Sequence, residues 1–326
     1  MPTFTSKRLN VLPASAIART DLATLLRAMS AQPPSHSSLR GGWASTVDLQ
    51  SNLGVLNAAP PPSVPEIVPA TAQYPERLLA RYYYFVENAK AREARPTASA
   101  QEISVLQAID VLISAEGPNK FLVLFSSRTM AELAPKIFKS LRQLFLEADE
   151  DALLTTRTSS LDFDQPDLFL WLARRARDNP SLDGDTELRM IEAMSGQDHS
   201  SRLTVISNGV DFDRPAFLTA VAEVEQLGPA KIAMVDTRLD ARLHLELWPN
   251  GSFSVITSKT HYRNIVDSRT ERLQSVFDLA YTIIPKVVSI YRGDEEWQRS
   301  GRSQEILAAA RALIERYQRM YPDIVL

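Results

Sequence analysis

The feature that most constrains the fold is a series of short apolar runs, each followed by a segment of helical periodicity. In "KFLVLFS" (120–126) the apolar residues are consecutive rather than alternating, which is typical of a strand buried on both faces. The runs "RLTVISNG" (202–209) and "KIAMVDT" (231–237) have the same character, and "ALLTTRTSS" (152–160) is a further strand candidate. Strands that alternate with helices predict an α/β fold with a doubly wound, mostly parallel sheet and helices on both faces.

The helices between these strands are predicted from apolar spacing and from prolines. One helix has its apolar face over residues 130–145, and we expect it to begin near Ala134, because Pro135 is tolerated only in the first turn. Further helices are expected from Pro166, from near Thr186, and from Pro215 to a left-handed stop at Gly228.

A β-hairpin, "RLHLELWPNGSFSVITS" (242–258), departs from the strand–helix alternation. A two-residue Asn-Gly turn would mix apolar and polar residues on one face. A three-residue loop, 249–251, sets Leu247 opposite Phe253 and Leu245 opposite Val255, and it gives Gly251 the left-handed position of a G1 bulge. We therefore expect the three-residue loop, with the hairpin added to the main sheet.

The chain divides into four parts by composition and periodicity. Residues 1–75 hold half of the 20 prolines, so we expect an extended, proline-rich arm without its own core. Residues 76–117 are expected to form two helices that pack on the main domain, the second opened by a capping box of Ser99 and Glu102. Residues 118–291 form the α/β domain, and 292–326 the C-terminal helix.

Two long helices are expected to close the chain. The first begins at Ser268, with Glu271 three residues on as a capping box, and the second runs from about Glu295 to Met320.

Charge and cysteine content exclude several classes of function. The net charge is -3, so nucleic acid and anionic membranes are not expected as partners. The chain has no cysteine, which excludes disulfides, thiolate zinc sites and cysteine nucleophiles. The N-terminus lacks a signal-peptide core, and no run is long and apolar enough to span a bilayer, so we expect a cytoplasmic protein.

Hydroxyl residues follow the predicted strand ends in an order that resembles the von Willebrand factor A (vWA) domain. The stretches are "FSSRTM" (125–130), "GDTEL" (184–188) and "SNG" (207–209). In that family the corresponding motifs form a metal-ion-dependent adhesion site at the carboxyl edge of the sheet. The resemblance implies that Ser127, Thr129, Thr186 and Asn208 occupy its ligand positions.

Two departures from the family pattern imply that this metal site is degenerate. Phe125 and Asn208 stand where the family has aspartates, and Mg²⁺ usually relies on at least one carboxylate. We therefore expect no cofactor, or only weak Mg²⁺ binding. Asp183, Asp185 and Asp211 are the nearby carboxylates that would restore it. The resemblance then implies a partner-binding rim of Phe125, Ser127, Thr129, Thr186 and Asn208.

These observations predict a non-enzymatic scaffold subunit of a larger assembly. The resemblance implies a protein partner such as an AAA+ ATPase or another assembly subunit. One alternative is a divalent-metal-dependent hydrolase or nuclease that uses Asp236, Asp240, His244 and Glu246. A second alternative is a structural subunit that forms homo-oligomers through its N-terminal arm.

Overall fold

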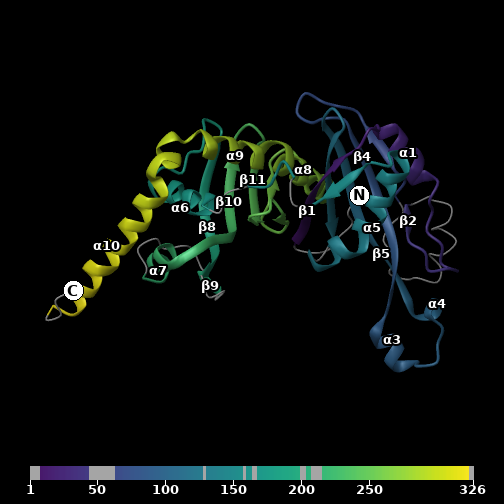
Figure 1. Ribbon diagram of the computed structural model, residues 1–326, viewed down its shortest axis with the longest axis horizontal. Coiled ribbons are helices and arrows are strands. Elements are labelled where there is room, and N and C mark those ends of the chain that lie inside the picture. The colour runs from purple at the N-terminus through teal and green to yellow at the C-terminus, as the bar shows by residue number, and fades with distance from the viewer. Residues whose placement is uncertain are drawn as a thin grey trace. The chain divides into compact units, whose positions relative to one another are not determined.

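The computed structural model describes residues 8–43, 63–127, 130–156, 159–163, 167–198, 203–206 and 215–322. The chain divides into two compact units, Met1–Ser160 (unit 1) and Leu161–Leu326 (unit 2). Each unit consists of β-strands and helices (Figure 1).

Unit 1 is built on an antiparallel sheet with the strand order β2-β4-β5-β6-β1, to which β3 adds on β4 and β7 on β1. Its strands are β1 (Arg8–Ile17), β2 (Gly42–Trp43), β3 (Glu66–Val68), β4 (Arg77–Glu87), β5 (Ser104–Gly117), β6 (Lys120–Ser127) and β7 (Leu153–Thr155). Its helices are α1 (Leu22–Ser30), α3 (Ala89–Ala94), α4 (Ala100–Ile103) and α5 (Met130–Ala148).

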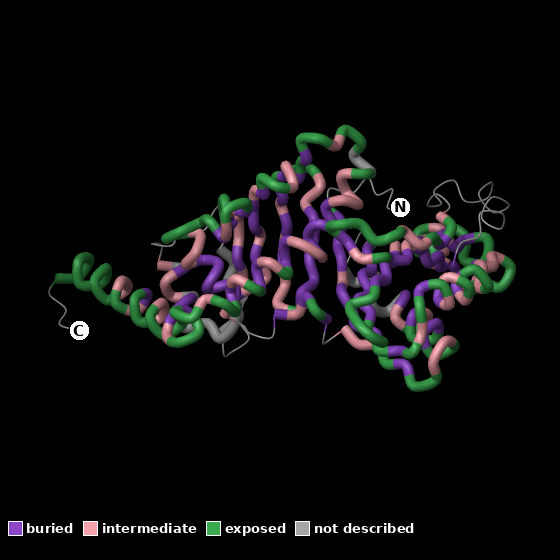
Figure 2. The backbone as a smooth tube through the Cα atoms, turned by 90° about the horizontal axis from the view of Figure 1, so that it is seen from above, coloured by how far each residue is buried: buried purple, intermediate pink, exposed green. Residues whose placement is uncertain are grey.

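The core of unit 1 lies between one face of this sheet and the helices α1 and α5. The three tyrosines of β4 show how the strand divides between faces. Tyr82 and Tyr84 belong to the helix-side core, whereas Tyr83 belongs to a small cluster with Leu106 and Ala108. Both faces of the long strands are therefore buried along much of their length, as Figure 2 shows.

Unit 2 is built on antiparallel strands in the order β12-β11-β10-β8-β9, to which β13 adds on β11. Its strands are β8 (Thr186–Asp198), β9 (Leu203–Ile206), β10 (Val224–Asp236), β11 (Ala241–Leu247), β12 (Phe253–Ile256) and β13 (His261–Tyr262). Its helices are α6 (Leu168–Asp178), α7 (Pro215–Glu223), α8 (Ser268–Asp278), α9 (Ile284–Gly293) and α10 (Arg302–Met320), with π-helical turns η1 (Leu279–Ile283) and η2 (Trp297–Gly301).

The predicted hairpin of unit 2 is confirmed in both loop and register. Leu247 pairs with Phe253 and Leu245 with Val255 across β11 and β12. Gly251 has φ +75°, and an added Cβ would collide with the backbone at Leu161, so this position requires glycine. The local turn chemistry was sufficient to fix this register.

The predicted fold class is wrong, because the strands of both units pair antiparallel and do not form a mostly parallel, doubly wound sheet. The run 120–126 is indeed a buried strand, β6, but it pairs antiparallel with β1 and β5. Consecutive apolar residues report burial on two faces and carry no information about strand direction. The β5–β6 turn at Pro118 and Asn119, where Asn119 has φ +58°, brings the chain straight back instead of through a helical crossover.

Several predicted elements are also wrong in type. The expected helix after Glu76 is strand β4, and the Ser99–Glu102 capping box opens only the one-turn helix α4, after which the chain becomes β5. Thr186 opens a strand, not a helix. Gly228 does not end a helix but lies inside β10, where the pairing with β8 is irregular. The helix expected near Ala134 begins at Met130.

Residues 1–75 are not an extended arm throughout. Within them β1 pairs along its length with β6, and Leu25 and Met29 of α1 belong to the core of unit 1. Residues 1–7 and 44–62 lie outside the described residues. The boundary of unit 1 at Ser160 also differs from the predicted domain boundary at residue 118.

The two closing helices are confirmed in their approximate extent. The first is capped by Asp267, one residue before the predicted cap, whose carboxylate accepts from the Thr270 amide at 2.8 Å. The second is helical from Glu295 to Met320. Within the described residues, one helical run, Thr270–Gly293, is long and apolar enough to cross a membrane, and 56% of its apolar window is buried inside the structure. That burial is typical of a core helix.

Candidate interaction site

Of the predicted partner-binding rim, the structure describes the side chains of Phe125 and Thr186 only, and both are buried. Phe125 lies within β6 and is 0% exposed in the core of unit 1. Thr186 lies in unit 2 at the start of β8 and is 1% exposed. The side chains of Ser127, Thr129 and Asn208 lie outside what the structure describes, as does Asp211. A rim at the carboxyl ends of parallel strands has no counterpart in these antiparallel sheets.

The four residues of the hydrolase alternative are also not brought together. Asp236 is fully buried at the end of β10, whereas Asp240 lies in the turn after it with φ +52°. His244 and Glu246 alternate along β11 with buried leucines, so they lie on its other face. Among the described residues, no group of three or more His, Asp or Glu side chains is placed to hold a metal ion.

The structure instead brings Thr186 and Asp236 together with a lysine that the sequence did not single out. The Thr186 hydroxyl donates to Asp236 Oδ2 at 2.7 Å. Lys286 Nζ, from α9, donates to Thr186 Oγ1 at 2.7 Å and lies 3.3 Å from Asp236 Oδ2. Asp236 Oδ1 accepts from the Leu239 amide at 2.9 Å. This buried charge is therefore satisfied on both oxygens.

Asp183 completes this anchor cluster, which we define as Asp183, Thr186, Asp236 and Lys286. Its carboxylate lies 3.0 Å from Lys286 Nζ and accepts from the Asp185 and Thr186 amides. Partial burial alone would raise the pKa of Asp183, but Lys286 and the two amides outweigh it and lower that pKa to about 2.

The anchor cluster is arranged to hold α9 on the sheet rather than to react. The hydroxyl of Thr186 is used as both donor and acceptor and is closed to solvent, so a substrate cannot reach it. The ammonium of Lys286 is paired with two carboxylates instead of facing an open pocket. We conclude that the two predicted residues Thr186 and Asp236 are structural.

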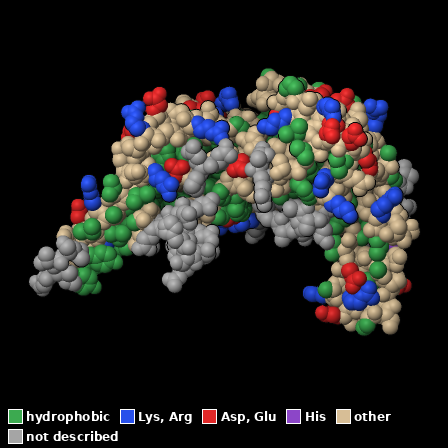
Figure 3. Space-filling model, viewed as in Figure 1, with side chains coloured by type: hydrophobic (Ala, Val, Ile, Leu, Met, Phe, Trp, Pro, Cys, Tyr) green, Lys and Arg blue, Asp and Glu red, His purple; other side chains and the backbone are tan. Residues whose placement is uncertain are grey.

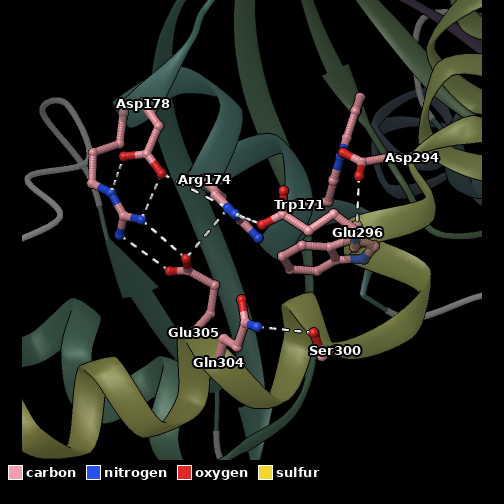
Figure 4. Close-up of polar contacts among 10 residues, drawn as sticks. Trp171, Arg174, Asp178, Asp294, Glu296, Ser300, Gln304 and Glu305 are labelled. Carbon is pink, nitrogen blue, oxygen red and sulfur yellow. Dashed lines mark hydrogen bonds and ion pairs between the residues drawn. The ribbon is translucent and has the colours of Figure 1, made fainter.

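A second set of polar contacts fixes the C-terminal segment to α6. Asp167 accepts from the Tyr291 hydroxyl at 2.5 Å and from Trp297 Nε1 at 3.0 Å. Trp171 Nε1 donates to Asp294 at 2.9 Å (Figure 4). Burial and the neighbouring Asp167 raise the pKa of Tyr291, so its hydroxyl stays a proton donor across the physiological range.

Ion pairs extend these contacts from α6 to the first turn of α10. We call the polar contacts and ion pairs together the clamp. Arg174 pairs with Glu296 at 2.7 Å, and Arg177 pairs with Glu305 at 3.0 Å (Figure 4). The hydrogen bonds that Arg177 donates to Asp178 and Glu305 raise the pKa of its guanidinium. Glu305 is 12% exposed, so its pair is more sheltered than most surface pairs. The N-terminal end of α10 is thus held in a fixed orientation on α6.

Beyond this clamp, α10 carries large apolar side chains that the described residues leave about half exposed. The exposed fractions are 56% for Leu307, 47% for Ile314, 48% for Tyr317 and 54% for Tyr321, the residue that follows the helix. Hydrophobic side chains gather along this helix in Figure 3. By contrast, Ala309 is 5% exposed, and α10 packs against α7.

Three of these exposed residues, Leu307, Ile314 and Tyr317, share one face of α10 with the half-buried Ala310, at a heptad spacing that the chain continues to Tyr321 just past the helix. Leu307, Ala310, Ile314, Tyr317 and Tyr321 follow one another at intervals of three and four residues, which is the spacing of the a and d positions of a coiled coil. We call this set the α10 stripe. A regular apolar stripe on an anchored helix is the described surface best suited to bind another helix.

The α10 stripe could have been read from the sequence, because the spacing over residues 307–321 is regular. The interpretation of this segment as a closing helix left open which of its faces is covered. The role of Lys286 had no local signal, since its partners lie 50 and 100 residues away.

No family model matches this chain, and no curated protein matches it either.

Proposed function

We propose that this protein is a non-enzymatic interaction subunit that binds another polypeptide helix through the α10 stripe. The observation that carries the proposal is the exposure of Leu307, Ile314 and Tyr317 on one face of a clamped helix. Contiguous apolar surface of this kind on a protein is typical of a protein-interaction site. Helices that dock in this way present anchors at i, i+3 and i+7 spacing.

The geometry supports recognition more than catalysis. Among the described residues that the sequence suggested for chemistry, Thr186 and Asp236 are enclosed in the anchor cluster, whereas His244 and Glu246 lie along β11. The clamp on α6 would present a rigid stripe, which lowers the entropic cost of binding. This proposal moves the partner-binding surface from the predicted rim to α10. The AAA+ ATPase partner, implied only by the resemblance, stays a prediction, as does the cytoplasmic location.

The proposal is tested by a pair of matched substitutions on α10. Ile314→Asp places a charge in the stripe, whereas Ala308→Asp places the same charge at an exposed position on another face. We expect wild-type protein and Ala308→Asp to retain the same partner from a native extract, and Ile314→Asp to lose it. Binding should also slow amide hydrogen exchange over residues 304–321. An equal yield with Ile314→Asp, or protection elsewhere, would contradict the proposal.

A further inference from the structure

We propose that Glu192, His244 and Lys259 form a proton-operated latch on the connection between β12 and β13 (residues 257–260) of unit 2. When His244 takes up a proton, it draws the carboxylate of Glu192 away from Lys259, and mild acid thereby loosens this connection. None of the three residues belongs to the α10 stripe, so the latch is independent of the proposed function.

The three residues of the latch come from three elements and meet above one small side chain. Glu192 lies on β8, His244 on β11 and Lys259 in the segment after β12. Strand β10 runs between β8 and β11, and its residue opposite His244 is Ala233, whose short side chain leaves room above it. Nδ1 of His244 lies 3.3 Å from Oε1 of Glu192, and Nζ of Lys259 donates to the same oxygen at 2.8 Å. One carboxylate oxygen therefore faces two groups that can carry positive charge.

The imidazole of His244 is placed so that a proton changes what it can bind. Its side chain is 13% exposed, and Nδ1 is buried and makes no hydrogen bond to a described residue. An imidazolium carries a proton on both ring nitrogens, so charging the ring gives Nδ1 a proton to donate to Glu192. The resulting charge-assisted hydrogen bond is stronger than the contact that the neutral ring makes.

The charged neighbours of His244 set the pH range of the latch. Burial lowers the pKa of His244, Glu192 opposes this effect, and Lys259 and Arg242 add to it. Further charged residues of β8, β10 and β11 lie opposite or beside one another, namely Glu187 and Arg189 on β8, and Lys231 and Glu246 across β10 and β11. The imidazole is therefore uncharged at neutral pH and takes up its proton in mild acid.

Exposure decides which of the two cations keeps the carboxylate. The side chain of Lys259 is 50% exposed, whereas that of His244 is 13% exposed. Water solvates a released ammonium, but a charged imidazole at a sheltered position depends on its one acidic neighbour. When both groups are charged, His244 keeps Glu192 and Lys259 turns to solvent.

The release of Lys259 removes a contact that ties the connection across the sheet to β8. The connection keeps its own turn, in which the amides of Lys259 and Thr260 donate to the Ile256 carbonyl at 3.0 and 3.1 Å. It also keeps the Thr260 hydroxyl, which accepts from the His244 amide at 3.1 Å. We therefore expect acid to loosen the connection locally while the strands stay paired.

The latch is tested by following both cations and the connection in one pH titration of the full chain. Nuclear magnetic resonance reports the charge of His244 and the state of the Lys259 side chain. Amide hydrogen exchange, corrected for the intrinsic effect of pH, reports the protection of residues 257–262.

Between about pH 7.5 and about pH 5, the range in which a histidine charges, this protection should fall about threefold, as for the loss of a partly exposed ion pair. Protonation of His244 and the change at Lys259 should share one midpoint, below the ordinary histidine value of 6.5. Different midpoints, or a charged His244 with unchanged protection, would overturn the inference.

Variants separate the latch from a general effect of acid. His244→Gln cannot charge and should keep the same protection at both pH values. His261→Gln is the matched control, because His261 is 74% exposed, and it should respond like the wild type. Glu192→Gln and Lys259→Met each remove the ion pair and should show low protection at both pH values.

A pH response that persists in His244→Gln would overturn the latch. A response that begins only below about pH 4 would contradict it equally, because that range belongs to Asp183. Should a variant fold poorly, the shared midpoint in the wild type decides the question by itself.

Discussion

Helices α5 and α10 have the same length, 19 residues, and both have an apolar face, but only one of these faces is covered. In α5 the apolar residues Ile137, Leu141 and Leu144 are 0% exposed, because the helix lies on its own sheet and against α1. In α10 the corresponding face, with Leu307 and Ile314, is about half exposed. An amphipathic sequence therefore predicts a helix and its apolar face. Whether that face becomes part of the core or stays exposed depends on the rest of the fold.

The two units also differ in how they hold their helices. Unit 1 buries α5 in an apolar core. Unit 2 adds polar anchors, with Lys286 of α9 bound to a fully buried aspartate and α10 held by ion pairs to α6. Such directional contacts fix the orientation of a helix that has little sheet beneath it.

The covered and uncovered faces should respond very differently to the same substitution. Leu141→Ala is expected to lower the free energy of unfolding by about 4 kcal/mol, because it leaves a cavity at a site that is 0% exposed. Leu307→Ala is the matched control on α10 and should cost about 0.5 kcal/mol or less in the monomer. Urea denaturation of both variants measures the difference, and equal costs would refute the comparison.

Lys286, the anchor of α9, should contribute nearly as much to the free energy of unfolding as the buried Leu141 of α5. Lys286→Met is expected to destabilise unit 2 by about 3 kcal/mol, since it leaves the charge of Asp236 buried and unpaired. The double variant Lys286→Met with Asp236→Asn should recover part of this loss. Thermal unfolding of the two proteins checks this prediction, and identical midpoints for single variant and wild type would show that the lysine is not an anchor.

The clamp of α10 should contribute less, because its ion pairs are partly exposed. Arg177→Gln is expected to cost about 1 kcal/mol or less. A double-mutant cycle with Glu305→Gln isolates the pair, and its coupling energy should be favourable. The same variants should speed hydrogen exchange in the first turn of α10 while α5 is unaffected. A coupling energy of zero would remove the ion pair from the clamp.

Acid should weaken unit 2 through Asp183. Its pKa falls from 3.8 to about 2 on folding, so the stability it contributes is fully present above about pH 4 and is lost as the pH falls toward 2. Because Asp183 is about one-third exposed, we expect the loss to be about 1 kcal/mol or less. Asp183→Asn should flatten this part of the pH profile. An unchanged profile would contradict the assignment.

The smallest effect on folding is expected in the α10 stripe itself. Ile314→Ser should change the unfolding free energy of the monomer by about 0.5 kcal/mol or less, because the side chain is already half exposed. Its effect should appear in association instead. Denaturant unfolding of dilute protein separates the two, and a large loss there would mean that the stripe is covered within the chain.

The sequence revealed the elements whose signals are local. The turn at Pro249, Asn250 and Gly251 determines the register of its hairpin, and the Ser99–Glu102 capping box does open a helix. The same local reading failed for "RLLARYYYFVE". There the apolar residues suit a helix face as well as a strand buried on both sides, and the three consecutive tyrosines were the sign of a strand.

The contacts that join distant parts of the chain could not be read in this way. Strand direction depends on which runs pair, and both the pairing of β1 with β6 and the meeting of Lys286 with Asp236 span more than 45 residues. The predicted fold class was wrong for the same reason, and with it the parallel strands ending at one edge on which the predicted rim was based. The α10 stripe needed only its own spacing, but its exposure depends on the whole of unit 2.

The most direct test of the interaction surface is amide hydrogen exchange of α10 compared with α5, in the free protein and in protein that retains its partner from a native extract. We predict the same exchange in α5 under both conditions. In α10, exchange over residues 307–320 should be slower in the bound than in the free protein, and Ile314→Asp should abolish the difference. Exchange in α10 that is the same in the free and in the bound protein would contradict our account.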